Sequence, residues 1–116
     1  MGFWRELIES ALDRETLLEE REQVEWIARD PTNAQPYYNL AQLRRMQWKQ
    51  EEGLALLLEA VRLRPSFAEA HLALTEVYAV IGDYRAAWKH ARLAQANGRS
   101  SGVELLERYG ISESAE

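Results

Sequence analysis

The sequence of 116 residues contains no cysteine, three prolines and six glycines. Without cysteine the chain forms neither a disulfide framework nor a thiolate metal site, and the absence favours a reducing, cytoplasmic location. Long apolar runs are also missing, since none approaches the about 18 residues that a membrane-spanning helix needs. The first residues carry no apolar stretch of the length that a secretory signal requires. We therefore predict a cytoplasmic protein that does not associate with membranes.

Acidic residues outnumber basic ones, and both are unevenly distributed. The net charge is −5, from 19 acidic and 14 basic residues. Residues 1–33 hold nine acids and four bases, residues 34–101 hold six acids and nine bases, and residues 102–116 hold four acids and one base. Proteins that bind nucleic acid or anionic membranes carry positively charged surfaces. The composition therefore predicts no nucleic-acid partner.

The inventory of reactive side chains does not support catalysis. The two histidines, His71 and His90, stand 19 residues apart on separate predicted helices. Neither has an acidic residue at the spacing of a metal site. We expect His71 to lie in the core and His90 to face solvent. Ser100 and Ser101 are better explained as helix caps than as nucleophiles, so we predict no enzyme activity, no metal and no cofactor.

Two short segments with the same residue types recur along the chain. Thr32 is followed by Gln35, and Ser66 by Glu69, in each case directly after a proline that ends the preceding helix. This spacing is typical of a capping box, in which the hydroxyl and the longer side chain bind free backbone amides at a helix start. The two boxes are 34 residues apart, and Ser100 follows after another 34.

Other positions recur with the same period. The pairs in phase are Ala34 and Ala68, Leu40 and Leu74, and Ala60 and Ala94. A fixed period of this length indicates an array of helical hairpins, each packed on its neighbours. The pattern predicts one hairpin over residues 34–65, a second over residues 68–98, and a short capping helix over residues 101–110.

The first part of the chain is less regular, because one apolar stripe at helical spacing is followed by another that is rotated from it. The first stripe comprises Phe3, Trp4, Leu7, Ile8, Ala11 and Leu12, and the second comprises Leu17, Leu18, Val24, Ile27 and Ala28. Since a straight helix does not change its buried face midway, we predict two helices that form a degenerate hairpin over residues 1–31. The alternative is one long helix from Gly2 to Arg29, because no proline or further glycine interrupts the segment.

The spacing of large and small residues in the hairpins resembles the tetratricopeptide repeat family, whose pattern is Trp-x2-Leu-Gly-x2-Tyr, then Ala-x3-Phe, Ala and Pro. The second hairpin matches at His71, Leu74, Thr75, Tyr78, Gly82, Tyr84, Ala87, Ala91 and Ala94, and the first at Tyr37, Leu40, Ala41, Gly53, Leu57, Ala60 and Pro65. A degenerate earlier unit fits at Trp4, Leu7, Ile8, Ala11, Val24, Ile27 and Pro31, so the resemblance covers nearly the whole chain.

This resemblance implies an all-α fold, a right-handed helical-hairpin solenoid of about two and a half to three hairpins with a C-terminal capping helix. It implies a single domain over residues 1–111. Residues 112–116 are predicted to be a disordered tail.

Trp48 departs from the repeat pattern, because it occupies the turn position that Gly82 occupies in the second hairpin. A positive φ is usual at this position and favours glycine. We predict that the Trp48 ring packs into the space that Tyr84 fills in the second hairpin. The alternative is an exposed aromatic side chain that anchors a partner.

The first helix of each hairpin carries a second stripe beside its packing face. In tetratricopeptide proteins this face lines a concave groove that holds an extended peptide or a partner helix, and the resemblance implies the same here. The residues implied are Tyr38, Asn39, Gln42, Arg45, Glu69, Leu72 and Glu76. Tyr38 and Leu72 offer apolar contact, and the amides of Asn39 and Gln42 can bind a peptide backbone. A solvated helix face carries the same residue types, so both interpretations stay open at this point.

Two functions are compatible with such an array. The first is a protein-interaction module or scaffold that binds a protein or peptide partner in the groove. The second is a structural protein that associates with itself, because so short an array gains surface by pairing. The tryptophans Trp4, Trp26, Trp48 and Trp88 exceed what a small core needs, and any exposed one would mark a contact surface.

Overall fold

The computed structural model describes residues 2–113, apart from the side chains of residues 8–12, and this part of the chain is helical without any strand. The helices are α1 (Gly2–Arg29), α2 (Ala34–Met46), α3 (Gln50–Leu63), α4 (Ala68–Ile81), α5 (Tyr84–Ala96) and α6 (Ser101–Arg108). None of the described helices is long and apolar enough to cross a bilayer. The molecule is elongated, since its Cα radius of gyration is 16.3 Å and a compact chain of this length has about 13 Å.

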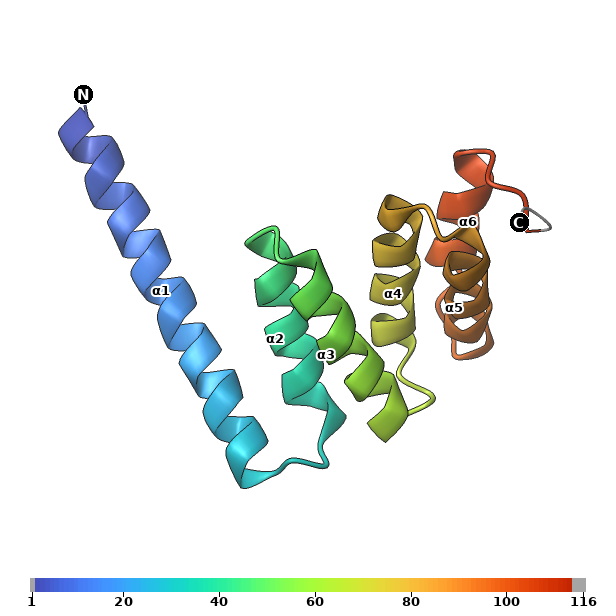
Figure 1. Cartoon of the computed structure of the whole chain (residues 1–116), viewed down its shortest axis with the longest axis horizontal. Helices are drawn as coiled ribbons and strands as arrows, with labels where there is room; N and C mark the ends of the chain where they lie inside the picture. Colours follow the sequence, from blue (N-terminus) through green and yellow to red (C-terminus); the bar gives the residue numbers. More distant parts are fainter. Residues whose placement is uncertain (1, 114–116) are drawn as a thin grey trace.

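Consecutive helices pack side by side as antiparallel pairs (Figure 1). The most extensive contacts join α2 to α3 and α4 to α5, so these two hairpins are the structural units. Contacts between the units are smaller: α1 lies on α2, α3 lies on α4, and α6 lies on both α5 and α4. The prediction of an all-α chain built from sequential helix pairs is confirmed.

Residues that stand 34 positions apart occupy matching places in the two hairpins. The pairs that are buried in both hairpins are Ala34 and Ala68, Pro36 and Ala70, Leu40 and Leu74, Ala41 and Thr75, Leu43 and Val77, Gly53 and Ala87, Leu57 and Ala91, and Ala60 and Ala94. Most of them contain at least one small side chain, which lets two helix backbones approach closely. The sequence period is therefore also a period of burial.

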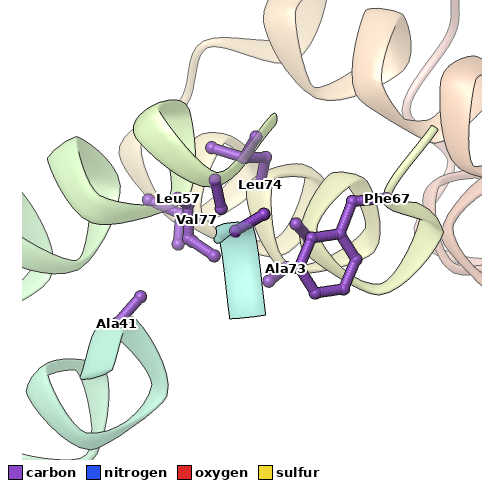
Figure 2. Packing of buried hydrophobic residues seen from close by; sticks show 9 residues of the cluster. Ala41, Leu57, Phe67, Ala73, Leu74 and Val77 are labelled. Carbon is purple, nitrogen blue, oxygen red and sulfur yellow. The ribbon is translucent and has the colours of Figure 1, made fainter. Parts of the chain in front are cut away.

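The core consists of two apolar clusters. The larger one connects the α2–α3 hairpin to α4, and its members labelled in Figure 2 are Ala41, Leu57, Phe67, Ala73, Leu74 and Val77. The smaller one connects α5 to α6 and contains Ala87, Trp88, Ala91, Val103 and Leu106. Each cluster thus joins a hairpin to the element that follows it, which is how a linear array of repeats is stabilised.

The N-terminal segment is one helix, and the predicted pair of helices over residues 1–31 is wrong. α1 is unbroken for 28 residues from Gly2 to Arg29. Its sequence is rich in glutamate, leucine and arginine, which are strong helix formers. The long-helix alternative is therefore correct.

The apolar stripe of α1 rotates without breaking the helix because this stripe is not the packing face. The exposed members of the stripe are Phe3, Trp4, Leu7, Leu17, Leu18 and Val24; the side chains of Ile8, Ala11 and Leu12 lie outside the described part. Ile27 is the half-buried member among those that the structure describes. Polar groups take part in the contact with α2, since Glu20 pairs with Arg44 at 2.9 Å. A stripe that is not buried can change direction along a straight helix without an energetic cost.

The predicted capping boxes at Thr32 and Ser66 are also wrong, because each helix begins one residue later. Asn33 caps α2, and its side-chain oxygen accepts a hydrogen bond from the Gln35 amide at 3.0 Å. Phe67 stands at the cap position of α4 and makes no side-chain cap bond. Since the Phe67 ring is buried in the larger core cluster, packing rather than local hydrogen bonding sets the start of α4.

Trp48 does not pack into the turn between α2 and α3, so that prediction is wrong: the residue is 86% exposed. Its φ is +62°, and the φ of Gly82 in the turn between α4 and α5 is +93°. In both turns the amide of the next residue donates to the carbonyl five positions before it, at 2.9 Å. The two turns share one geometry, and at position 48 this geometry directs the indole into solvent.

Replacing Trp48 by glycine should therefore stabilise the protein. The left-handed conformation costs a residue with a Cβ about 1–2 kcal/mol, and the exposed indole loses little burial. We expect Trp48→Gly to raise the free energy of unfolding in urea by about 1 kcal/mol, after the larger chain entropy of glycine is subtracted. Gly82→Ala is the matched opposite change and should lower it. A loss of stability in Trp48→Gly would mean that the indole makes stabilising contacts.

His71 and His90 form a buried pair between α4 and α5. His71 lies in the core as predicted, but the prediction that His90 faces solvent is wrong, because it is 6% exposed. His71 Nε2 donates to the Pro65 carbonyl at 2.7 Å, so a neutral His71 accepts at Nδ1 from His90 Nδ1–H at 2.9 Å. The buried alanines Ala87 and Ala94 of α5 stand three and four residues from His90, a spacing that predicts its burial.

This pair makes the stability depend on pH. Burial, and then the neighbouring His71 ring and Lys89, lower the pKa of His90 from 6.5 to about 4. Stability is lost as the pH falls through this range, because the unfolded chain takes up a proton that the folded chain does not. We expect this group alone to lower the unfolding free energy by about 2 kcal/mol between pH 7.5 and about pH 5, as measured by urea denaturation.

The control for this experiment is His90→Gln, whose amide donates to His71 but does not titrate. Over the same pH range, the unfolding free energy of the variant should fall by about 2 kcal/mol less than that of the parent protein. Equal losses in the two proteins would contradict a buried, neutral His90.

Residues after α6 fold back onto α5. Trp88 Nε1 donates to the Ile111 carbonyl at 3.0 Å, and the Arg92 guanidinium bonds the Glu113 carboxylate at 2.9 Å. Of the tail predicted to be disordered over residues 112–116, residues 114–116 lie outside the described part, whereas Glu113 makes this ion pair.

Candidate functional site

The stripe implied as a binding surface lies on α2 and α4, whose side chains meet along it. Tyr38 of α2 lies against Phe67, with ring centroids 5.1 Å apart. Burial raises the pKa of Tyr38, and the carboxylates of Glu69 and Glu76 raise it further, while nearby arginines act in the opposite direction. Tyr38 and both carboxylates therefore belong to one electrostatic neighbourhood.

Arg45 is the central side chain of this surface. Its Nη2 lies 3.4 Å from Glu76 Oε1, and its Nη1 donates to Gln42 Oε1 at 3.0 Å. The contact with Glu76 joins α2 to α4. Gly53 of α3 makes room for it, because a Cβ at that position would lie 2.8 Å from Arg45 Cγ. Gly53, which matches a small position of the repeat pattern, thus leaves space for a polar side chain.

A polar hollow of about 380 Å³ opens beside Arg45. It is lined by Gln42, Arg45, Met46, Gln50 and Glu76. Nε of Arg45 and Oε1 of Gln50 are themselves buried and have no hydrogen-bond partner among the described residues. The amide and charged side chains of the lining supply both hydrogen-bond donors and acceptors.

Glu69 and Leu72 lie at the side of α4 that faces the end of the array. Glu69 pairs with Arg99 at 3.3 Å, and both side chains are about half exposed. Leu72 packs beneath α6, since a Cβ on Gly102 would lie 3.2 Å from its Cδ1. Glu69 is therefore accessible at the edge of the surface, whereas Leu72 serves contact between helices.

Asn39 faces α1 instead of an open groove. Its Nδ2 donates to Gln23 Oε1 at 3.1 Å, and its Oδ1 accepts from Gln35 Nε2 at 2.9 Å. Both functional atoms of the amide thus have a partner: the bond to Gln23 attaches α1 to α2, and the bond from Gln35 lies within α2. The hydrogen bonds that we expected Asn39 to offer a peptide are made within the chain.

The predicted residues are therefore only partly brought together. Those that share one surface are Tyr38, Gln42, Arg45, Glu69 and Glu76, while Asn39 and Leu72 point to neighbouring helices. Sequence reasoning missed Met46 and Gln50, because they stand at a helix end and a helix start beside the turn. The signal available in the sequence was the apolar side chain of Met46 and the amide of Gln50 on either side of Trp48.

A second groove, which the sequence did not predict, lies between α4 and α6. Its volume is about 400 Å³, and its lining contains one charged residue, Glu76. The rest is mainly apolar, with Ala79, Val80, Tyr84, Leu105, Tyr109 and Ile111. Val80 and Tyr109 are 75% and 72% exposed, so a large apolar surface faces solvent at this end of the array.

Among the residues that the structure describes, no group of three or more histidine, aspartate or glutamate side chains is placed to hold a metal ion. Comparison with protein-family models finds no match, and a search of curated proteins finds no significant match. The resemblance to tetratricopeptide repeats therefore rests on the chain's own residues.

Proposed function

We propose that the chain is a short solenoid of the tetratricopeptide type and that it acts as a protein-interaction module. Burial that repeats every 34 residues, from Ala41 to Thr75 and from Ala60 to Ala94, supports this architecture. The matching left-handed turns at Trp48 and Gly82 support it as well. An array of this kind places its first helices along one surface, where a partner can contact several repeats at once.

The surface of α2 and α4 binds an extended peptide segment of a partner protein. The observation that carries this proposal is the polar hollow lined by Gln42, Arg45, Gln50 and Glu76. A peptide backbone supplies one acceptor and one donor per residue, and the amide side chains of the lining can bind both. Tyr38 and Phe67 provide apolar contact next to the hollow.

Hydrogen bonding rather than net charge selects the partner. Arg45 is already paired with Glu76, and Glu69 with Arg99, so the charges of this surface largely balance within the chain. The amides of Gln42 and Gln50 are the uncharged polar groups of the hollow.

Screening an array of short peptides with the Gln42→Ala/Gln50→Ala double variant tests the proposal. The variant removes two amides from the hollow without changing charge or any residue of the core. Since each lost hydrogen bond is worth about 0.5–1.5 kcal/mol, the peptides bound by the parent protein should bind about tenfold more weakly.

The control is Glu51→Ala/Glu52→Ala, which changes two exposed side chains on the outer side of α3. It should bind the same peptides as the parent protein. If the two double variants bind alike, or if the parent protein binds no peptide, the proposed site is wrong.

A further inference from the structure

Helix α1 lies at one end of the array (Figure 1), where it packs against α2 through one of its faces. The half-buried residues Thr16, Glu20, Gln23 and Ile27 stand on this face, four, three and four positions apart. A second row with the same alternation is offset from the first by one residue, which turns it about 100° around the helix. This row, which we call the seam, consists of Phe3, Leu7, Ser10, Arg14, Leu17, Arg21, Val24 and Ala28.

The seam has no covering element within the molecule. Every seam residue whose side chain the structure describes is exposed, and its large apolar members Phe3, Leu7, Leu17 and Val24 are exposed by half or more. A row of residues spaced alternately by four and three over about four heptads is the pattern along which two helices form a coiled coil. Since α1 has 28 residues, the seam continues over its whole length and is suited to a second helix.

The order of residues in the seam is complementary to its own reverse. If two copies of α1 run antiparallel with the whole seam overlapping, Leu7 of each copy lies opposite Val24 of the other. In the same arrangement Phe3 lies opposite Ala28, so that the largest apolar side chain of the seam meets the smallest. Apolar residues therefore face apolar residues at both ends of the contact, which is the packing that a coiled coil needs.

The two arginines of the seam favour this antiparallel arrangement. In a parallel pair, Arg14 would face Arg14 of the other copy and Arg21 would face Arg21, and these like charges repel. In the antiparallel pair, Arg14 lies opposite Leu17 and Arg21 opposite Ser10. Neither arginine takes part in an ion pair among the described residues, so both are available to a partner.

Acidic residues of the second copy stand next to these arginines. Glu6, Asp13 and Glu20 follow one edge of the seam at intervals of seven. Asp13 comes three positions after Ser10 and four before Leu17, so it lies between the two positions that the arginines face. Adjacent side chains on one helix point in different directions, and Asp13 is thus better placed for the arginines of the other copy than for its own neighbour Arg14.

The remaining glutamates of α1 do not oppose the contact strongly. Glu15, Glu19 and Glu22 are exposed and lie on the side of the helix away from the seam. Water and salt screen the repulsion between exposed charges that are about a Debye length apart, which is about 8–10 Å at physiological ionic strength. The charges close to the contact are the seam arginines and the acids at its edge, and these attract each other.

We propose that the seam of α1 binds the seam of a second copy of this chain in antiparallel orientation. Because both copies use the same surface, the contact is isologous and closes at a dimer. This inference does not depend on the peptide site on α2 and α4, which shares no residue with the seam, and each dimer carries two such sites.

Sedimentation velocity of the full chain over a concentration series gives the first test. Between about 1 μM and about 200 μM, the mass should rise by mass action from the 13.4 kDa of the monomer to twice that value and then stay constant. A mass that remains that of the monomer over the whole range, or one that continues to grow beyond the dimer, would overturn the proposal.

Single substitutions then identify the surface. Leu7→Glu and Val24→Glu each place carboxylates in an apolar layer of the seam, and both residues are exposed, so the fold is retained. Each variant should stay monomeric over the same concentration range. The control is Val80→Glu, which changes an exposed apolar residue of α4 and should dimerise like the parent protein. Equal association of the seam variants and the control would contradict the proposed surface.

Crosslinking through introduced cysteines tests the orientation, because the chain has no cysteine of its own. Leu7→Cys and Val24→Cys are mixed in equal amounts and treated with a short bismaleimide. In the antiparallel pair position 7 of one copy is next to position 24 of the other, so the mixture should give a crosslinked dimer that contains one copy of each variant.

Each cysteine variant alone should remain uncrosslinked, because the 17 residues between positions 7 and 24 separate its two cysteines in the dimer by about 26 Å. A parallel pair would give the reverse result, with crosslinked dimers in each single variant and no mixed product. That outcome, or a mixture that yields no crosslinked dimer, would overturn the proposal.

Discussion

Close approach of helix backbones at small residues is the constraint on which this structure depends. The buried small residues of the two hairpins include Ala41, Gly53, Ala60, Ala87 and Ala94. Where α2 crosses α3, a Cβ on Gly53 would lie 3.4 Å from the Ala41 carbonyl oxygen. No larger side chain fits between backbones this close. The constraint sets the two hairpins, and the larger residues Leu57, Leu74 and Val77 then fill the space between them (Figure 2).

The same arrangement leaves surfaces uncovered, and these surfaces determine what the molecule can bind. A linear array buries each hairpin against its neighbours and so has two ends and an open side. α1 is attached to α2 largely through polar contacts such as Glu20 with Arg44, while its apolar stripe faces solvent. The surface of α2 and α4 is polar with balanced charge, and the α4–α6 groove is apolar. The two surfaces therefore suit different partners.

The 34-residue period predicts much of the fold because equivalent positions in the two hairpins are packed in equivalent ways. Two predictions failed because packing overrode local chemistry. Phe67 rather than Ser66 stands at the cap position of α4 because its ring is buried, and His90 is buried along with its neighbours in α5. The prediction that the Trp48 ring is packed failed for the opposite reason. At this position the backbone geometry of the turn overrode the preference of an aromatic ring for burial. The Arg45–Glu76 contact and the α4–α6 groove depend on how separate helices lie against each other, which periodicity does not encode.

Helix α3 offers the most direct test of the central constraint, because it contains a fully buried alanine, Ala60, and an exposed one, Ala55. The measurement is the free energy of unfolding in urea for Ala60→Leu and Ala55→Leu. Ala60→Leu should lower it by about 1–3 kcal/mol through overpacking, and Ala55→Leu should change it by less than about 0.5 kcal/mol. Equal effects of the two substitutions would contradict the close helix crossing on which this account rests.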